Sequence, residues 1–409
     1  MMETETAKEV ADRLKSLGYD LLIQPGDGHG VVAILKNGPG RTVMLRAGMD
    51  AIPIKELNQL AYKSERTRTD RFGKERPAMH ACGHDIHMAC LLGAADLLQA
   101  ARESWSGTLI LLFQPGEEHS VGARRMIQQG LFTMTPKPDI IFGQHVARTA
   151  AGTVQLCSGP AMFSWNLFDV CLFGRDADSG NYRSPFFPAL NIVGRLQNIV
   201  KGEIRPKVDA IVKGDGAKIP AIVRVKCGAI ENPQNFNFDP DTVDMKISVQ
   251  TLHPKDRDPV IQVVKAVIRS ESVRFKLPKR TAIVESDNIP AIHNDEETVK
   301  TLAAAFKEHF GEAAVREIAR SELDDSSFSA EEPQFDDFAV FVEEAKCPCV
   351  YWNIRDMEPS VFEERGRNGA PNRLPLAGYH SPRYLPVVTK TIETGIDTLA
   401  LAVLVYLKP

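Results

Sequence analysis

The sequence predicts an α/β protein in which a mostly parallel sheet is covered by helices on both faces. A small two-layer α+β domain of the ferredoxin-like type is expected as an insertion. Strand-like apolar runs alternate with helical patterns in the first part of the chain, which is typical of parallel sheets. The rhythm then changes near Ser164 to half-exposed strands and long helices. At 409 residues the chain is also longer than a single core usually supports.

The first region combines strongly periodic helices with β-branched or continuously apolar strands. Apolar residues recur at helical spacing in AKEVADRLKSLGY, and the run GTLILLF has the composition of a buried strand. Helices are expected at 7–19, 84–102 and 122–132, and strands at 30–38, 41–48, 107–113 and 139–146. The turn NGPG separates the first two of these strands.

The second region has the pattern of a half-exposed sheet with two helices. Strands are expected at 167–174, 221–230 and 242–252, and helices at 186–200 and 258–270. A helix at 296–311, a strand at 348–353 and a helix at 391–407 would return the chain to the first sheet. We therefore expect a discontinuous catalytic domain, 1–163 plus 291–409, and an inserted domain at 164–290.

Charge and composition favour a small-molecule partner. The formal net charge is -4 and no run of Lys and Arg is present, so we expect neither a nucleic acid nor a membrane as a partner. The acidic start METETAKEV has no apolar signal core, and the odd number of cysteines, seven, predicts mostly reduced thiols. A cytoplasmic protein is expected.

Side chains that could bind a metal occur at four separated places, each at the end of a predicted strand or helix. They are Cys82 with His84, Glu117 with Glu118, His145, and His380. Binding sites in open α/β sheets lie at the carboxyl ends of the strands, so these places could converge. A mixture of thiolate, imidazole and carboxylate suits zinc or manganese, and of two adjacent glutamates one can bind metal while the other takes a proton from water.

Other interpretations of these residues remain open. A cysteine nucleophile with a histidine base is possible but leaves the glutamate pair unexplained. A redox role for Cys82 is weak, because the stretch has no CxxC partner. The remaining polar residues of the two motifs, expected to cap the helix or to surround the metal ligands, are His80, Asp85, His87 and His119.

The order of these motifs resembles that of the M20 metallopeptidase family. The closest branch is that of amidohydrolases acting on N-acyl amino acids, hippurate-like conjugates and auxin–amino acid conjugates. The motifs that carry the resemblance are LRAGMDAIPIKE, MHACGHDIHMACLLGAA, QPGEE followed by GARRMIQQGLF, GQHV, DDF and YHSP. Together they cover nearly the whole chain.

The resemblance implies a two-metal hydrolase whose inserted lid domain forms a homodimer. The implied metal ligands are Cys82, His84, Glu118, His145 and His380. Glu117 would be the general base, with Asp50 as a second catalytic residue. Asp178 and Asn232 of the lid would contact the substrate. The cofactor would be two divalent ions, zinc or manganese, and the substrate a small amide.

Three departures from the family pattern bear on function. Relatives read Asp-x-Asp where this chain has Gly48-Met49-Asp50, and they carry a further N-terminal segment. The lid motif FGRGGHG reads FGRDADSG here, so Asp178 replaces a histidine that polarises the scissile carbonyl. Gln250 stands where relatives often have Arg.

The function expected from the sequence is therefore metal-dependent hydrolysis of an amide bond. Two alternatives stay open because of Asp178. One is a non-hydrolytic reaction on the same fold, such as amide formation or an isomerisation. The other is a metal-binding homologue without turnover.

Overall fold

The described chain divides into two compact units. The computed structural model describes residues 3–22, 28–70, 73–176, 179–198, 223–231, 241–318, 335–360 and 377–408. Unit 1 combines Met1–Ala161 with His293–Pro409, and unit 2 is Met162–Ile292. The boundaries expected from the sequence, after residues 163 and 290, each differ from these by two positions.

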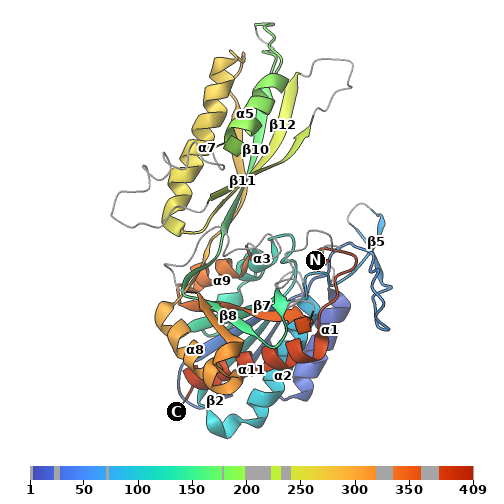
Figure 1. Ribbon diagram of the computed structural model, residues 1–409, viewed down its shortest axis with the longest axis vertical. Helices are drawn as coiled ribbons and strands as arrows, with labels where there is room; N and C mark the ends of the chain where they lie inside the picture. Colours follow the sequence, from blue (N-terminus) through green and yellow to red (C-terminus); the bar gives the residue numbers. More distant parts are fainter. Residues whose placement is uncertain are drawn as a thin grey trace. The chain divides into compact units, whose positions relative to one another are not determined.

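Unit 1 is built on an eight-stranded sheet (Figure 1). Its strands are β1 Asp20–Leu22, β2 Val31–Asn37, β3 Thr42–Gly48, β6 Gly107–Gln114, β7 Ile140–Ala150, β8 Val154–Cys157, β15 Val315–Ile318 and β16 Cys349–Met357. Their order across the sheet is β1-β2-β6-β3-β7-β16-β8-β15. The central strands β6, β3, β7 and β16 are parallel. The prediction of an α/β fold with a mainly parallel central sheet is confirmed.

The outer parts of this sheet include antiparallel pairs, although the edge strand β15 is parallel to β8. β1 and β2 extend one side in antiparallel fashion, and β8 is antiparallel to β16. The turn after β2 does not make a hairpin with β3, because β6 lies between the two and pairs with both. A strand as thoroughly buried as β6 needs neighbours on both sides.

Helices cover both faces of the sheet in unit 1. Leu45, Phe142 and Trp352 belong to the core formed with α1, α2, α8 and α11. On the other face, Phe338 at the start of α9 packs edge-on against Tyr351, with ring centroids 4.9 Å apart. The helices are α1 Thr4–Ser16, α2 His84–Ala100, α3 Gly122–Gln128, α4 Leu131–Met134, α8 Glu296–Phe310, α9 Phe338–Ala345 and α11 Val388–Tyr406.

The helix expected at 122–132 is interrupted in the structure. α3 ends at Gln128, and α4 begins at Leu131. Gly130 between them has φ 92°, a left-handed conformation that cannot continue a right-handed helix. The apolar periodicity continues across this break, which is why the sequence pattern alone predicts one helix.

Unit 2 is a two-layer α+β structure (Figure 1). Its antiparallel sheet has the order β11-β12-β10-β13, and α5 and α7 share a core with it through Phe168, Ile192, Ile247 and Val264. The elements are β10 Ser164–Phe173, α5 Phe186–Asn198, β11 Val223–Glu231, β12 Thr242–Thr251, α7 Pro254–Arg274 and β13 Ala282–Ile289. This order of described elements is that of a split β-α-β arrangement.

Two short strand pairs complete the described structure. Thr67–Thr69 (β4) pairs with Glu75–Pro77 (β5), and Gly159–Met162 (β9) pairs with Ile292–Asn294 (β14). The pairing of β9 with β14 brings together the two places where the chain passes between the units. Short 3-10 helices lie at Arg102–Ser104 and Glu312–Ala314.

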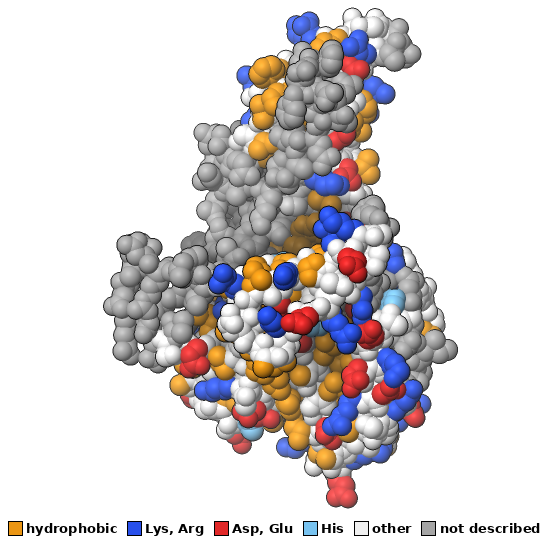
Figure 2. Space-filling view, turned by 90° about the vertical axis from the view of Figure 1, so that its right-hand side faces the viewer, with side chains coloured by type: hydrophobic (Ala, Val, Ile, Leu, Met, Phe, Trp, Pro, Cys, Tyr) orange, Lys and Arg blue, Asp and Glu red, His pale blue; other side chains and the backbone are white. Residues whose placement is uncertain are grey.

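The surface charges of unit 1 are mixed. Figure 2 shows basic and acidic side chains interspersed over the described part of this unit on the face in view. Within the described residues, no helix combines the length and the apolar composition needed to cross a membrane.

Substitution of Asn294 on β14 should lower the stability of unit 1. Its buried amide donates to the backbone oxygens of Cys157 and Tyr351, at 2.9 and 2.8 Å, and accepts from the Tyr351 N–H at 2.7 Å. Asn294→Ala leaves these groups buried without partners, so we expect unfolding free energy to fall by about 3 kcal/mol. Urea unfolding followed by tryptophan fluorescence measures the change. The exposed Gln128→Ala should shift it by less than about 0.5 kcal/mol, and equal effects of the two substitutions would contradict the assignment.

Candidate metal centre

The turn before α2 presents two of the predicted ligands. Gly83 separates Cys82 from His84 and has φ 76°. A Cβ atom at this position would lie 2.5 Å from Val146 Cγ2 and 3.1 Å from Tyr384 Oη. Both the backbone conformation and the close packing therefore require glycine, and the resulting turn directs the two side chains into the site.

His145, near the middle of β7, faces Cys82 from the sheet. Its Nδ1 donates to the Val146 oxygen at 2.8 Å, so its Nε2 is the free nitrogen, and this atom lies 3.6 Å from Cys82 Sγ. The Tyr379 hydroxyl donates to the same Val146 oxygen at 2.8 Å. Burial lowers the pKa of His145 to about 4. The ring is therefore neutral at pH 7, as a metal ligand must be.

His87 on α2 supports this arrangement through the backbone. The Val146 N–H donates to His87 Nε2 at 3.0 Å, and burial lowers the pKa of His87 well below its usual value. The neutral ring thereby fixes the strand that carries His145. Of the other motif residues, Asp85 accepts from the Ile86 N–H and His119 is exposed.

Asp50, just after β3, orients His84. His84 Nδ1 donates to the Asp50 backbone oxygen at 2.9 Å and lies 3.2 Å from Asp50 Oδ1. Burial alone would lower the pKa of His84, but the hydrogen bond and charge of Asp50 raise it to about 9. His84 Nε2 lies 3.5 Å from Glu117 Oε2. Among the described residues this nitrogen has no hydrogen-bond partner, so it is available for a metal.

The glutamate pair lies in the tight turn after β6. The Glu118 N–H donates to Asp50 Oδ2 at 2.8 Å, and Glu118 Oε2 lies 3.2 Å from His380 Nε2. Burial and the negative charges of Asp336 and Glu118 raise the pKa of Glu117 well above its usual value. The two adjacent carboxyl groups thus have different surroundings, as different roles require.

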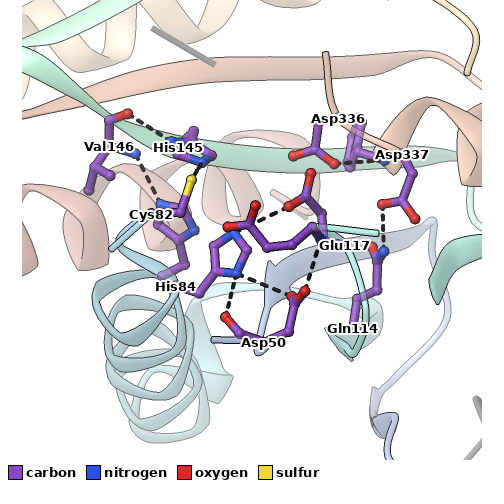
Figure 3. A network of polar contacts seen from close by, with 12 residues as sticks. Asp50, Cys82, His84, Gln114, Glu117, His145, Val146, Asp336 and Asp337 are labelled. Atoms are coloured by element: carbon purple, nitrogen blue, oxygen red, sulfur yellow. Dashed lines mark hydrogen bonds and ion pairs between the residues drawn. The ribbon is translucent and has the colours of Figure 1, made fainter. Parts of the chain in front are cut away.

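The predicted ligands come together in overlapping groups (Figure 3). Potential ligand atoms lie within 4.8 Å of one another in the sets Cys82, His84, His145; Cys82, Glu118, His380; and Asp50, His84, Glu117. Cys82 belongs to the first two sets, so its sulfur could contact two ions. Buried Glu118 Oε1 has no partner among the described residues. Sulfur, nitrogen and oxygen donors in such sets fit divalent zinc.

A buried ionic network that the sequence patterns did not predict lies beside Glu117. Arg46 on β3 makes two hydrogen bonds to Asp336, at 3.0 and 2.8 Å. Asp337 accepts from Gln114 at 2.5 Å (Figure 3). The motif DDF was part of the family resemblance, but its partner Arg46 lies 290 positions away, and no local signal identifies such a pair.

Two predicted substrate-binding residues, Asp178 and Asn232, lie outside the described residues. Gln250, a departure that the sequence indicated, is buried on β12. Its Oε1 atom has no hydrogen-bond partner in the described part of the chain.

An α/β sheet that gathers thiol, imidazole and carboxylate groups beside a second glutamate defines the class of metal-dependent hydrolases. The model of the peptidase family M20/M25/M40 matches residues 44–351. The chain belongs to this family, and the resemblance predicted from the motifs is confirmed. It is therefore a hydrolase of a family whose named relatives act on amide or peptide bonds.

Similar proteins include two bacterial amidohydrolases and one solved structure. The chain is 31% identical over 351 residues to hippurate hydrolase of Campylobacter jejuni, covering 84% of this chain and 81% of that protein. It is 29% identical over 353 residues to N-acetylcysteine deacetylase of Bacillus subtilis, covering 83% and 80%. The structure of the Bacillus subtilis YXEP protein, described as a dinuclear metal-binding M20 peptidase, matches with TM-score 0.72 and 22% identity over 99% of this chain and 92% of that one. The last similarity concerns the fold alone.

Gly48 is packed closely against the candidate ligand His84. A Cβ atom there would lie 3.2 Å from three atoms of the His84 ring, which is also held by its hydrogen bond to the Asp50 backbone oxygen. Gly48→Ala should therefore displace the ring and weaken metal affinity about 10- to 100-fold. Competition with a chelator measures this. Gly194→Ala, which meets no atom within 4 Å, should leave the affinity unchanged, and an equally tight Gly48→Ala protein would refute the packing argument.

Metal uptake should release protons at pH 8. Burial and the charge of Glu118 raise the pKa of the Cys82 thiol well above 9, and that of His84 is about 9. Both groups hold a proton at pH 8 and must lose it on binding a metal. We expect Cys82→Ala to release about one proton fewer than the wild type, and release from His84 to fall as the pH rises above 9. Calorimetry in buffers of different ionisation enthalpy counts these protons, and identical counts would contradict ligation by Cys82.

Proposed function

We propose that the protein is a metal-dependent amidohydrolase that cleaves N-acyl amino acids or related small amide conjugates. The observation that carries this proposal is the position of Glu117, a partly buried carboxyl group 3.5 Å from His84 in a cluster of ligand-type side chains. The relatives named hippurate hydrolase and N-acetylcysteine deacetylase act on substrates of this chemical class by their names, which supports the choice.

The proposed cofactor is a pair of divalent ions, zinc or manganese. The side chains that would hold them are Cys82, His84, Glu118, His145 and His380. Bound divalent ions lower the pKa of a water molecule to about 7 and polarise a carbonyl group. His145 Nε2 lies 3.6 Å from Cys82 Sγ, and His84 Nε2 has no hydrogen-bond partner among the described residues, so both atoms are placed to contact an ion.

Glu117 would move the proton in this reaction. Burial, Asp336 and Glu118 raise the pKa of Glu117, so its carboxylate would be basic enough to take a proton from the attacking water at neutral pH. The protonated group would then donate that proton to the leaving amine. Asp50 would hold the ring of His84 during both steps.

Unit 2 would act as the lid and as the site of homodimer formation, as the family resemblance implies. Asp178 replaces the histidine that relatives use to polarise the carbonyl. Losing such a donor typically costs about 10²- to 10³-fold in rate. We therefore propose slow hydrolysis of simple N-acetyl and N-benzoyl amino acids.

Two substitutions test the separate roles of the glutamates. Glu117→Gln should lower kcat about a thousandfold while the metal content stays the same, because only the proton acceptor is lost. Glu118→Gln should lower the metal content as well, because a charged ligand is lost. Metal analysis and assays on N-acyl amino acids measure both effects. Equal metal loss in the two proteins would overturn the assignment, and a metal-loaded wild type without hydrolysis would favour a non-hydrolytic reaction.

A further inference from the structure

Asn353 lies directly beside the predicted ligand His145. The two residues are register partners on the parallel strands β16 and β7. Neighbouring strands are about 4.8 Å apart, and paired residues direct their side chains to the same face of the sheet. The side chain of Asn353 therefore lies on the face that carries the His145 imidazole.

The Asn353 side chain has unused hydrogen-bonding capacity. Its Oδ1 atom is buried, and no described residue donates to it. Buried polar atoms without a partner are rare and need an explanation. Asn294, a structural asparagine nearby, differs in that both ends of its amide are hydrogen-bonded. Gln155 is the register partner of Asn353 on β8, and its side-chain oxygen accepts a hydrogen bond from Arg355.

The chemistry of this position suits one part of an amide substrate. If the scissile carbonyl is directed at the ligand cluster, the N–H of the same amide enters a water-poor site and needs an acceptor. A carboxamide oxygen accepts a hydrogen bond without a charge, so it neither titrates near neutral pH nor repels a substrate carboxylate. Asn353 is half-buried, so its amide can reach both the protein interior and a bound molecule.

Building on the proposed hydrolysis of N-acyl amino acids, we propose that Asn353 is a substrate-binding residue. Its Oδ1 accepts a hydrogen bond from the N–H of the scissile amide. This hydrogen bond positions the scissile C–N bond beside His145. The consequence is a preference for amides over the corresponding esters, because an ester has an oxygen in place of the N–H and leaves Oδ1 unpaired.

Matched amide and ester substrates test this assignment. We would measure kcat/KM for an N-acyl amino acid and for the O-acyl hydroxy acid of the same shape, on wild type, Asn353→Ala and Asn353→Leu. Both variants should lose about tenfold on the amide and less than threefold on the ester, as expected for one neutral hydrogen bond. Asn294→Ala, a change at a structural asparagine, should leave the amide-to-ester ratio unchanged. Equal losses on both substrates, or none, would overturn the proposal.

Binding separates this proposal from the proposed hydrolysis. In the Glu117→Gln background, calorimetry with the intact amide and ester gives dissociation constants without turnover. Asn353→Ala should weaken binding of the amide about tenfold and leave binding of the ester nearly unchanged. If this binding result is obtained while the wild type with its metal bound does not hydrolyse the amide, the proposed reaction is refuted and the role of Asn353 is supported. Amide binding that is absent, or insensitive to the substitution, would refute the role of Asn353.

Discussion

The buried ion pair between Arg46 and Asp336 is the interaction on which the organisation of the site depends. The guanidinium group binds both carboxylate oxygens, and both side chains are about 1% exposed. Asp336 also accepts from the Tyr351 hydroxyl and the Phe338 N–H. A buried ion pair is tolerated only when its remaining polar groups are satisfied. This pair meets that condition and connects β3, β16 and the start of α9.

A second carboxyl group makes the same region electronegative. Asp337 accepts from Gln114 and from the Ala123 N–H at the start of α3. Burial and the neighbouring charge of Asp336 raise its pKa to about 7, although Arg46 opposes the rise. One guanidinium group faces several carboxyl groups here, so the local potential attracts cations. The charges that organise the backbone therefore also favour divalent ions at the adjacent ligands.

Local sequence patterns predicted the elements with strong periodicity and the positions of most candidate ligands. Cys82 and His84 could be predicted because they are close in sequence and precede the helix α2. The position of β6 between β2 and β3 could not, because strand order depends on long-range packing. The partnership of Arg46 with Asp336 and the register of Asn353 with His145 have the same origin. Each of these contacts forms between segments that are far apart in the sequence and meet only in the folded protein. The pattern of a single sequence therefore does not predict them.

The pairing of β9 with β14 has a consequence for protein engineering. These two short strands hold the ends of the insertion side by side. A domain whose two ends lie close together can be inserted into another domain without distorting the host. Residues 162–292 could therefore be replaced by another domain, or by a tight reverse turn that joins the two parts of unit 1. The eight-stranded sheet and the candidate ligands of unit 1 all lie outside this segment, so the remaining host would keep them and could receive other lid domains.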